Sequence, residues 1–411
     1  MLFKDVIGQE GVKTHLREMV QHNRLSHALL FLGKEGSGAL PLAIAFANYI
    51  SLSSGIRTGA ADDGLFSSSA GDLTGETRRT STDPDVVTSE HPSYAKVKSM
   101  VHPDIHFSYP VIPRKAGQPP ISTDYISEWR EFIAQYPYGS AYDWLQFIGA
   151  DNKQGNITAQ ECNDIIRKLS LKSFESEYKI LVLWMPEYLG NEGNKLLKLI
   201  EEPPANTLFI LVAENESLVL QTIISRTQLV KVPALENYDI NQALINRAHL
   251  PVEQATRISA VCDGNYREAL QLMQHADEDW QSLLREWLNA IMKNGPVAQV
   301  KWVDEISKLG RERQKQFLRY FNHLLEQSVR LRSMEAHYNA PGNEHLMPEY
   351  EREFARKLNM RAGLAEQQEM VRELDQASYY IERNANAKML FLALTIKLYH
   401  IIAEKSLILV A

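Results

Sequence analysis

The chain has 411 residues, a formal net charge of -7 and two cysteines. Its length allows two or three domains, and its 44% hydrophobic and 23% charged residues are ordinary for a globular protein. The charge excludes a globally basic nucleic-acid binder, and two cysteines exclude a disulfide framework or a cysteine zinc site. The N-terminus lacks a signal-peptide pattern and no apolar run approaches about 18 residues, so we expect a cytoplasmic protein without membrane contacts.

The N-terminal part of the chain alternates between helix and strand. The apolar run HALLFLG (27–33) predicts a strand, and ALPLAIAFANYI (39–50) predicts a helix with Pro41 in its first turn, where proline is tolerated. Residues 53–90 contain mainly Ser, Thr, Gly and Asp with few large apolar residues, which predicts a flexible insertion. IHFSYPV (105–111) has the composition of a further strand.

Three more segments complete an α/β pattern. The stretch TAQECNDIIRKLSLKSF (158–174) predicts an amphipathic helix, with Thr158 as N-cap and Glu161 completing a capping box. KILVLWM (179–185) and TLFILVA (207–213) are continuous apolar runs typical of buried strands. Strands that alternate with helices in this way predict a parallel α/β sheet flanked by helices.

Beyond about Leu235 the strand signals disappear. The apolar segments that follow have helical spacing, so we expect the C-terminal part of the chain to be all-helical. The charged stretch MPEYEREFARKLNMRAGL (347–364) is most simply a solvated helical surface or a loop between helices.

The sequence GKEGSGAL after the first strand has the shape of a phosphate-binding loop. A working loop needs a lysine that reaches the β- and γ-phosphates and a hydroxyl that binds magnesium, both directly after the last glycine. Gly33, Gly36 and Gly38 preserve the turn. Ala39 and Leu40 stand where the lysine and the hydroxyl are needed. The residues themselves therefore favour a tight strand-to-helix turn over a triphosphate site.

Several stretches in a fixed order resemble the AAA+ subunits of bacterial DNA polymerase III clamp loaders, in particular the delta-prime family. They are FKDVIGQEGVKTHL, LSHALLFLG, KILVLWMPE, NKLLKLIEEPPANTLFILVAENESLVLQTIISRTQLVKV and DGNYREALQL. The likeness covers residues 2–51 and about 157–275, and is looser in the helical C-terminus. It implies an AAA+ P-loop-type α/β domain at 1–234 with the 53–90 insertion in place of a zinc module, a helical lid domain at 235–290 and a helical collar domain for oligomerisation at 291–411.

The resemblance also implies a degenerate ATP site. Catalytic relatives carry an acidic pair after the strand KILVL, where this chain has Trp184 and Met185, and Glu187 comes two residues too late. Ala213 stands where they carry a polar sensor. We therefore expect no ATP hydrolysis and no nucleotide cofactor.

Two arginines match motifs of the family. Ser225 and Arg226 match a Ser-Arg-Cys motif whose arginine acts as a finger on the ATP bound by a neighbouring subunit. A purely structural pairing of Arg226 with a surface carboxylate is the alternative. Arg267 matches the second-sensor arginine, for which a structural salt bridge is the better expectation because the site in the same chain lacks its catalytic groups.

The usual four-cysteine zinc module of the family is missing, since no cysteine occurs between Met1 and Val101. His91, His102 and His106 are not expected to replace it, so we predict no metal. For DNA, the candidate phosphate contacts lie on one predicted helix, although a solvated basic edge is an equally good interpretation: Arg167, Lys168 and Lys172.

The resemblance implies a non-hydrolysing subunit, not an enzyme by itself, in the clamp loader of the DNA polymerase III holoenzyme. Its partners would be the gamma/tau and delta subunits, the sliding clamp and primer–template DNA, and its task would be to scaffold the ring and supply the arginine finger in trans. Two alternatives remain: an active AAA+ ATPase subunit of the gamma/tau kind, or a stand-alone DNA-binding AAA+ protein.

Overall fold

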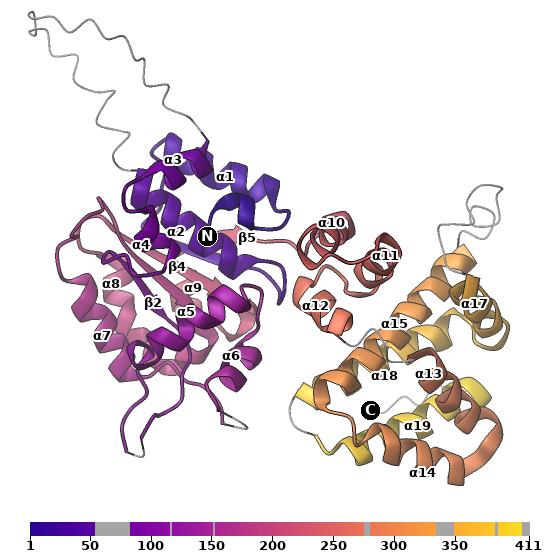
Figure 1. Cartoon of the computed structure of the whole chain (residues 1–411). Coiled ribbons are helices and arrows are strands. Elements are labelled where there is room, and N and C mark those ends of the chain that lie inside the picture. Colours follow the sequence, from indigo (N-terminus) through magenta and orange to yellow (C-terminus); the bar gives the residue numbers. More distant parts are fainter. Residues whose placement is uncertain are drawn as a thin grey trace, which may run out of the picture. The chain divides into compact units, whose positions relative to one another are not determined.

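The computed structural model divides into two compact units, Met1–Gln271 and Leu272–Ala411 (Figure 1). The sequence-based borders at 234/235 and 290/291 do not coincide with this division, and the three-domain organisation stays a prediction. No helix in the described part of the chain is long and apolar enough to cross a membrane. The structure describes residues 1–53, 83–115, 117–150, 153–274, 280–333, 349–382 and 385–404.

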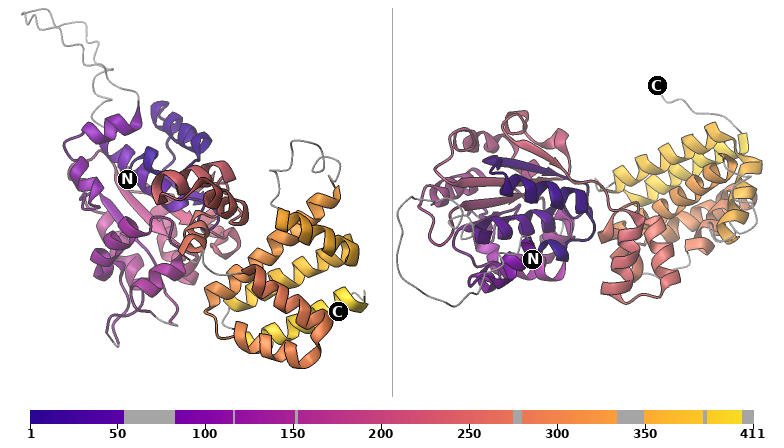
Figure 2. Two further views of the ribbon diagram at one scale, coloured as in Figure 1. Left: turned by 45° about the vertical axis from the view of Figure 1, so that its right-hand side comes forward. Right: turned by 90° about the horizontal axis from the view of Figure 1, so that it is seen from above.

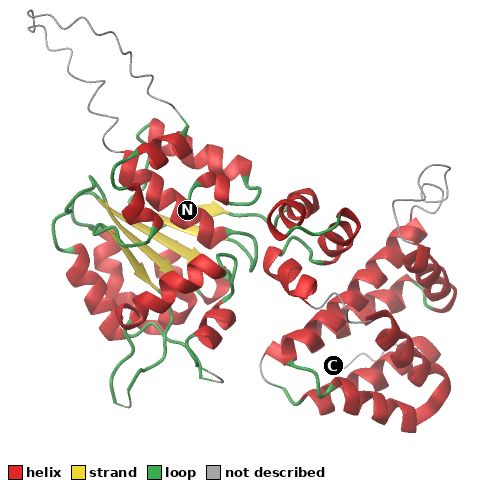
Figure 3. Ribbon diagram, viewed as in Figure 1, coloured by secondary structure: helices red, strands yellow, loops and turns green. Residues whose placement is uncertain are grey.

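The first unit is built on a five-stranded sheet whose strands all run parallel (Figure 3). The strand order is β2-β3-β4-β1-β5, so β1 lies between β4 and β5. The predicted parallel α/β sheet is thus confirmed. The strands are β1 (Ala28–Leu32), β2 (Ile105–Ser108), β3 (Lys179–Trp184), β4 (Thr207–Ala213) and β5 (Gln228–Lys231).

Helices cover both faces of the sheet (Figure 2). They do so because successive residues of the central strands are apolar and point to opposite sides. Leu29 and Phe31 belong to the core that α1 to α6 cover, and Leu30 to the core beneath α7 to α9. These helices are α1 (Glu10–Gln21), α2 (Ala39–Ser53), α3 (Pro84–Glu90), α4 (Tyr94–Lys98), α5 (Ile126–Gln135), α6 (Ala141–Phe147), α7 (Ala159–Leu169), α8 (Leu197–Glu201) and α9 (Gln221–Ile224). Short 3-10 segments are η1 (Phe3–Asp5), η3 (Ser122–Tyr125), η4 (Pro186–Leu196) and η5 (Glu216–Leu218).

Two helices and the start of a third complete the first unit after the sheet. Gly264 joins the second to the third with φ +77°, and a Cβ there would lie 2.7 Å from the Cβ of Ala234. Only glycine fits this close approach without strain. The helices are α10 (Asn237–Ala248), α11 (Val252–Val261) and α12 (Tyr266–Gln274).

All regular structure described in the second unit is helical, as expected. Trp287 stacks on Trp302 at 4.5 Å between ring centroids in the middle of its core. The charged stretch 347–364 contributes a helix that buries Ala355 and Leu358. The elements are α13 (Trp280–Asn289), η6 (Ala290–Asn294), α14 (Gly295–Ile306), α15 (Arg311–Ser333), α17 (Glu349–Arg361), α18 (Leu364–Glu382), α19 (Ala387–Tyr399) and η8 (His400–Glu404).

The predicted flexible insertion 53–90 is wrong at its C-terminal end. Pro84–Glu90 forms helix α3, with Asp83 as N-cap. The carboxylate of Asp85 accepts hydrogen bonds from the backbone N–H groups of Phe3 at 2.7 Å and Lys4 at 2.8 Å, which ties α3 to the N-terminus. Residues 54–82 of the predicted insertion lie outside the described residues.

The predicted capping box of α7 is half right. The Thr158 hydroxyl accepts a hydrogen bond from the N–H of Glu161 at 3.3 Å, so Thr158 is the N-cap. The Glu161 carboxylate does not return this bond. It is buried and accepts hydrogen bonds from the Ser108 hydroxyl at 2.7 Å and from the N–H and hydroxyl of Ser122 at 2.7 and 2.6 Å.

Candidate functional site

The glycine-rich loop joins β1 to α2 at the carboxyl ends of the strands, where α/β folds bind ligands. Gly36 and Gly38 have φ values of +72° and +89°, so the backbone has the turn for which glycine is needed. Lys34 is exposed to solvent. Ala39 and Leu40 are buried at the start of α2, 7% and 5% exposed.

Little space remains at this loop. The cavity between the loop, Trp184, Tyr138 and Glu214 has a volume of about 20 Å³. A volume of this size holds about one water molecule, whereas sites for small ligands measure roughly 300–1,000 Å³. The Tyr138 ring fills the space over Gly38, since a Cβ on that glycine would lie 3.0 Å from it.

The segment before α12 closes the loop from another side. The N–H of Tyr266 donates a hydrogen bond to the carbonyl of Gly36 at 3.2 Å. Asn265 lies so close that a Cβ on Gly36 would come within 1.8 Å of its Oδ1. Asn265 also donates to the Glu35 carboxylate at 3.2 Å. The loop is therefore held by protein atoms on the side that α12 approaches.

Arg267 joins three elements at this place. Its side chain is 6% exposed, and its guanidinium binds Asp143 of α6 through two nitrogens, with Nη2 2.7 Å from Oδ1. Its Nη1 lies 2.9 Å from Oε1 of Glu35 in the loop. Burial raises the pKa of Asp143, but the hydrogen bonds and charge of Arg267 outweigh burial and hold that pKa below its usual value. Arg267 thus cross-links the loop, α6 and α12 by ion pairs.

The end of β3 supplies no carboxylate to the loop. Trp184 is 2% exposed and packs against Trp129 with ring centroids 5.3 Å apart. Glu187 instead accepts hydrogen bonds from the N–H groups of Glu214 at 2.7 Å and Asn215 at 2.9 Å, directly after β4. Burial raises the pKa of Glu187 despite these bonds. Glu187 therefore supports the end of β4 through its Oε1 atom.

Sequence reasoning missed Glu214, which lines the small cavity next to the loop. Burial, followed by the negative charges of Glu35 and Glu187, raises the pKa of Glu214 to about 8. At neutral pH this carboxyl group is therefore mainly protonated. Its position directly after a buried strand was the one available signal, because strand ends in a parallel sheet meet at the ligand-binding edge.

Arg226 follows the short helix α9 and its C-cap Ser225, far from this loop in the sequence, and its side chain is 36% exposed. Its Nε forms an ion pair with the Glu201 carboxylate of α8. Its Nη1 donates to the Thr222 carbonyl at 2.9 Å and to the Ser225 hydroxyl at 3.1 Å. The arginine is thus on the surface and held in one orientation by its own chain.

The three candidate DNA contacts differ in whether they form ion pairs within the chain. Arg167 and Lys168 share the carboxylate of Asp164, at 2.5 and 2.6 Å. Lys172 lies in the exposed loop after α7, close in sequence to Phe174, whose side chain is 80% exposed. The positive charge of the α7 edge is therefore partly neutralised within the chain.

The three histidines weighed as ligands make separate contacts. The Nδ1 atoms of His91 and His102 accept hydrogen bonds from the N–H groups of Ser93 and Asp104, at 3.1 and 3.2 Å. Burial, followed by the charge of a nearby lysine, lowers the pKa of His106 to about 4. Within the described ranges no three His, Cys, Asp or Glu side chains gather as a metal site would require.

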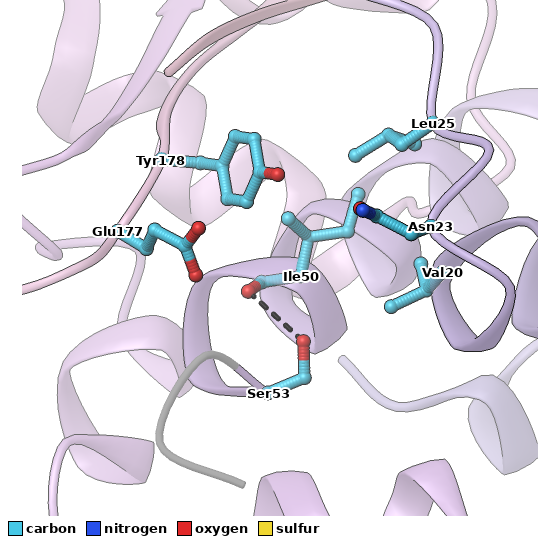
Figure 4. A pocket seen from close by; sticks show the side chains of 7 residues that line it. All are labelled: Val20, Asn23, Leu25, Ile50, Ser53, Glu177 and Tyr178. Carbon is cyan, nitrogen blue, oxygen red and sulfur yellow. Dashed lines mark hydrogen bonds between the residues drawn. The ribbon is translucent and has the colours of Figure 1, made fainter. Parts of the chain in front are cut away.

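A second small hollow lies where α1 and α2 end (Figure 4). The Ser53 hydroxyl donates to the Ile50 carbonyl at 3.2 Å there and closes the last turn of α2. The hollow measures about 10 Å³, which is the space of one water molecule or less. It is therefore no ligand site.

The match to a known protein family falls within the first unit, Met1–Gln271. Residues 79–236 match the family described as DNA polymerase III, delta subunit. The delta-prime subunit of Bacillus subtilis DNA polymerase III is 24% identical over 265 residues, which cover 64% of this chain and 59% of that subunit. The tau subunit of the same organism is 27% identical over 196 residues, 46% of this chain and 34% of tau. This chain therefore spans less than two thirds of the length of either relative.

Among solved structures, a gamma subunit-related protein of Thermotoga maritima covers 94% of this chain and 97% of its own, at 14% identity and a TM-score of 0.34. A TM-score this low adds nothing to the relationship. Residues 79–236 thus match the DNA polymerase III delta subunit family, and the chain is similar in sequence to the delta-prime and tau subunits of that polymerase.

Proposed function

We propose that the chain is a non-hydrolysing, delta-prime-like subunit of a bacterial clamp loader. In this role it would scaffold the ring with gamma/tau and delta subunits that loads the sliding clamp on primer–template DNA, as part of the DNA polymerase III holoenzyme. It would work in the cytoplasm, without zinc and without ATP of its own, and present Arg226 to the ATP of a neighbouring subunit.

The observation that carries this proposal is the filled phosphate loop. The cavity beside it has room for about one water molecule, and Trp184 stands where a magnesium-binding carboxylate would be needed. A buried guanidinium already neutralises the loop carboxylate Glu35. ATP binding would require several packed side chains to move, whereas nucleotide sites in general are largely pre-formed.

The contacts of Arg226 are compatible with a finger in trans. Both side chains of its ion pair with Glu201 are partly exposed, Arg226 by 36% and Glu201 by 45%. Exposed pairs of this kind contribute roughly 0–1 kcal/mol, so exchanging Glu201 for a phosphate of higher charge costs little. The hydrogen bonds to Thr222 and Ser225 would meanwhile keep the guanidinium oriented.

The similarity to a tau subunit favours one alternative, an active ATPase of the gamma/tau kind. The side chains at the loop oppose it, since Ala39 and Leu40 offer neither a charge for the phosphates nor a ligand for magnesium. A stand-alone DNA-binding role has less support, because Arg167 and Lys168 already pair with Asp164.

Two variants of one ion pair test the finger in a reconstituted ring. Both Arg226→Ala and Glu201→Gln break the Arg226–Glu201 pair, but only the first removes the guanidinium. We expect Arg226→Ala to lower turnover at the adjoining ATP site at least tenfold and to slow clamp loading, because arginine fingers contribute about 10³–10⁵ in rate. Glu201→Gln should leave both activities near the unmodified level.

Assembly of the ring, measured by size-exclusion chromatography, should persist with both variants. Equal turnover with Arg226→Ala and Glu201→Gln would show that the arginine only pairs with Glu201, and the finger role would be abandoned.

A further inference from the structure

The helical second unit contains a hollow of about 860 Å³, far larger than the two small cavities described above. We call it the α13–α17 groove, because its walls are α13 with η6 on one side and α17 on the other, and α15 forms its floor. The residues that define it are Leu288, Met292, Tyr320, Leu324, Phe354 and Leu358. A volume of this size is in the range of built binding sites and lies entirely within one unit.

The floor of the α13–α17 groove is apolar. Leu324 of α15 and Leu358 of α17 are buried, 2% and 7% exposed, and belong to the core of the unit. Phe354 and Met292 are only partly buried and pack against that core. Met360 at the edge is 79% exposed. A ligand could therefore cover apolar side chains that the chain itself leaves partly open.

The rim of the groove is basic. Arg285, Lys293, Lys357 and Arg361 line it, against a single described carboxylate, that of Glu353. Lys357 pairs with Glu353 at 2.6 Å. Neither Lys293 nor Arg361 has an ion-pair partner among the residues that the structure describes. This local excess of positive charge contrasts with the net charge of -7 of the whole chain.

We propose that the α13–α17 groove binds an acidic amphipathic helix of a partner protein. Grooves walled by helices, with an apolar floor, take the apolar face of a helix whose anchors recur at i, i+3, i+4 and i+7. The four rim cations would face the polar side of that helix, so acidic residues there add attraction and speed association. Methionine at the edge adapts readily to such a partner.

Binding at this site requires no ATP site, finger or DNA, so a failed peptide test leaves the proposed arginine-finger role untouched. The chain's own residues 405–411, KSLILVA, are a poorer fit, since they include Lys405 and no Asp or Glu. Their occupancy of the groove is one of the outcomes that the experiment distinguishes.

The experiment uses the full chain and two fluorescein-labelled 18-residue peptides that are matched in every apolar position. Both carry leucine at helical i, i+3, i+4 and i+7 spacing; one has glutamate and alanine elsewhere, the other lysine and alanine. Fluorescence anisotropy should show at least tenfold tighter binding of the acidic peptide, weakening as salt rises because exposed charges are screened.

Reversing two charges of the groove rim should increase the binding of one peptide, and a variant that failed to fold could not show such an increase. Lys293→Glu/Arg361→Glu should reduce binding of the acidic peptide at least tenfold and increase binding of the lysine peptide. The control Lys301→Glu/Lys308→Glu makes the same charge change outside the groove and should leave both affinities unchanged. Met360→Asp alters only an exposed edge residue and should weaken the binding of the acidic peptide several-fold.

Three results would overturn the proposal. The first is equal binding of both peptides, which would make the contact non-specific and apolar. The second is an equal effect of the control pair and the groove pair. The third is binding of the acidic peptide only after Ile408→Asp, which would mean that the chain's own C-terminal residues occupy the groove.

Discussion

Removing the guanidinium of Arg267 is the sharpest structural test of the filled loop. Arg267→Ala leaves Asp143 and Glu35 without their shared cation, in a place where the arginine itself is 6% exposed. Breaking a buried ion pair costs about 3–5 kcal/mol because the remaining charge is left uncompensated. The two carboxylates are 27% and 29% exposed and stay partly hydrated, so we expect the lower end, about 3 kcal/mol.

Differential scanning calorimetry of the full chain measures this loss through the transition of the Met1–Gln271 unit. A unit of this size loses about 2–4 °C in Tm per kcal/mol, so Arg267→Ala should lower that transition by about 6–12 °C. Arg267→Lys keeps the charge but not the paired geometry, so its Tm should lie between those of Arg267→Ala and the unmodified chain.

Arg257→Ala on the exposed side of α11 is the control, and it should change stability by less than about 0.5 kcal/mol. If Arg267→Ala lowered stability by less than about 1 kcal/mol, the ion pairs would not hold the loop closed and the structural role given to Arg267 would be wrong.

Two further substitutions test carboxyl groups of the first unit by urea unfolding. Glu214 has a pKa of about 8 in the folded chain and near 4.5 when unfolded, so the folded state binds more protons between these values and stability falls as pH rises through that window. Glu214→Gln should therefore be more stable than the unmodified chain at pH 8, by a few kcal/mol, with the gain vanishing towards pH 4.5; a gain independent of pH would contradict this. Glu161→Ala leaves the Ser108 and Ser122 donors unsatisfied and should cost about 3–5 kcal/mol, while Glu161→Gln, which keeps one acceptor oxygen, should cost clearly less; equal losses would count against these hydrogen bonds.

The central strands and most helices were predictable because their signals are local. KILVLWM and TLFILVA are long apolar runs, and they became the buried strands β3 and β4. The edge strand β5 was missed, because only Val230 of its four residues is buried and the run is too short to stand out. The helix α3 was missed since its stability depends on contacts with the N-terminus, which composition does not reveal.

The site was predictable only where a motif fixes the position. The missing lysine, hydroxyl and acidic pair could be read directly from Ala39, Leu40 and Trp184. The partners of Arg267 could not, because Asp143 precedes it by 124 residues and Glu35 by 232. The capping box of α7 was wrongly predicted for a similar reason. The Glu161 carboxylate accepts a hydrogen bond from Ser122, which is distant in sequence, and not from the backbone at the start of α7.

The claim that the phosphate loop of this chain no longer serves a nucleotide is tested most directly by titrating the isolated full chain with Mg²⁺ and ATP in a calorimeter, alongside a turnover assay. The filled cavity predicts no binding heat up to millimolar ATP and no phosphate release. Micromolar affinity with magnesium-dependent turnover would contradict the account and identify the chain as an active ATPase subunit.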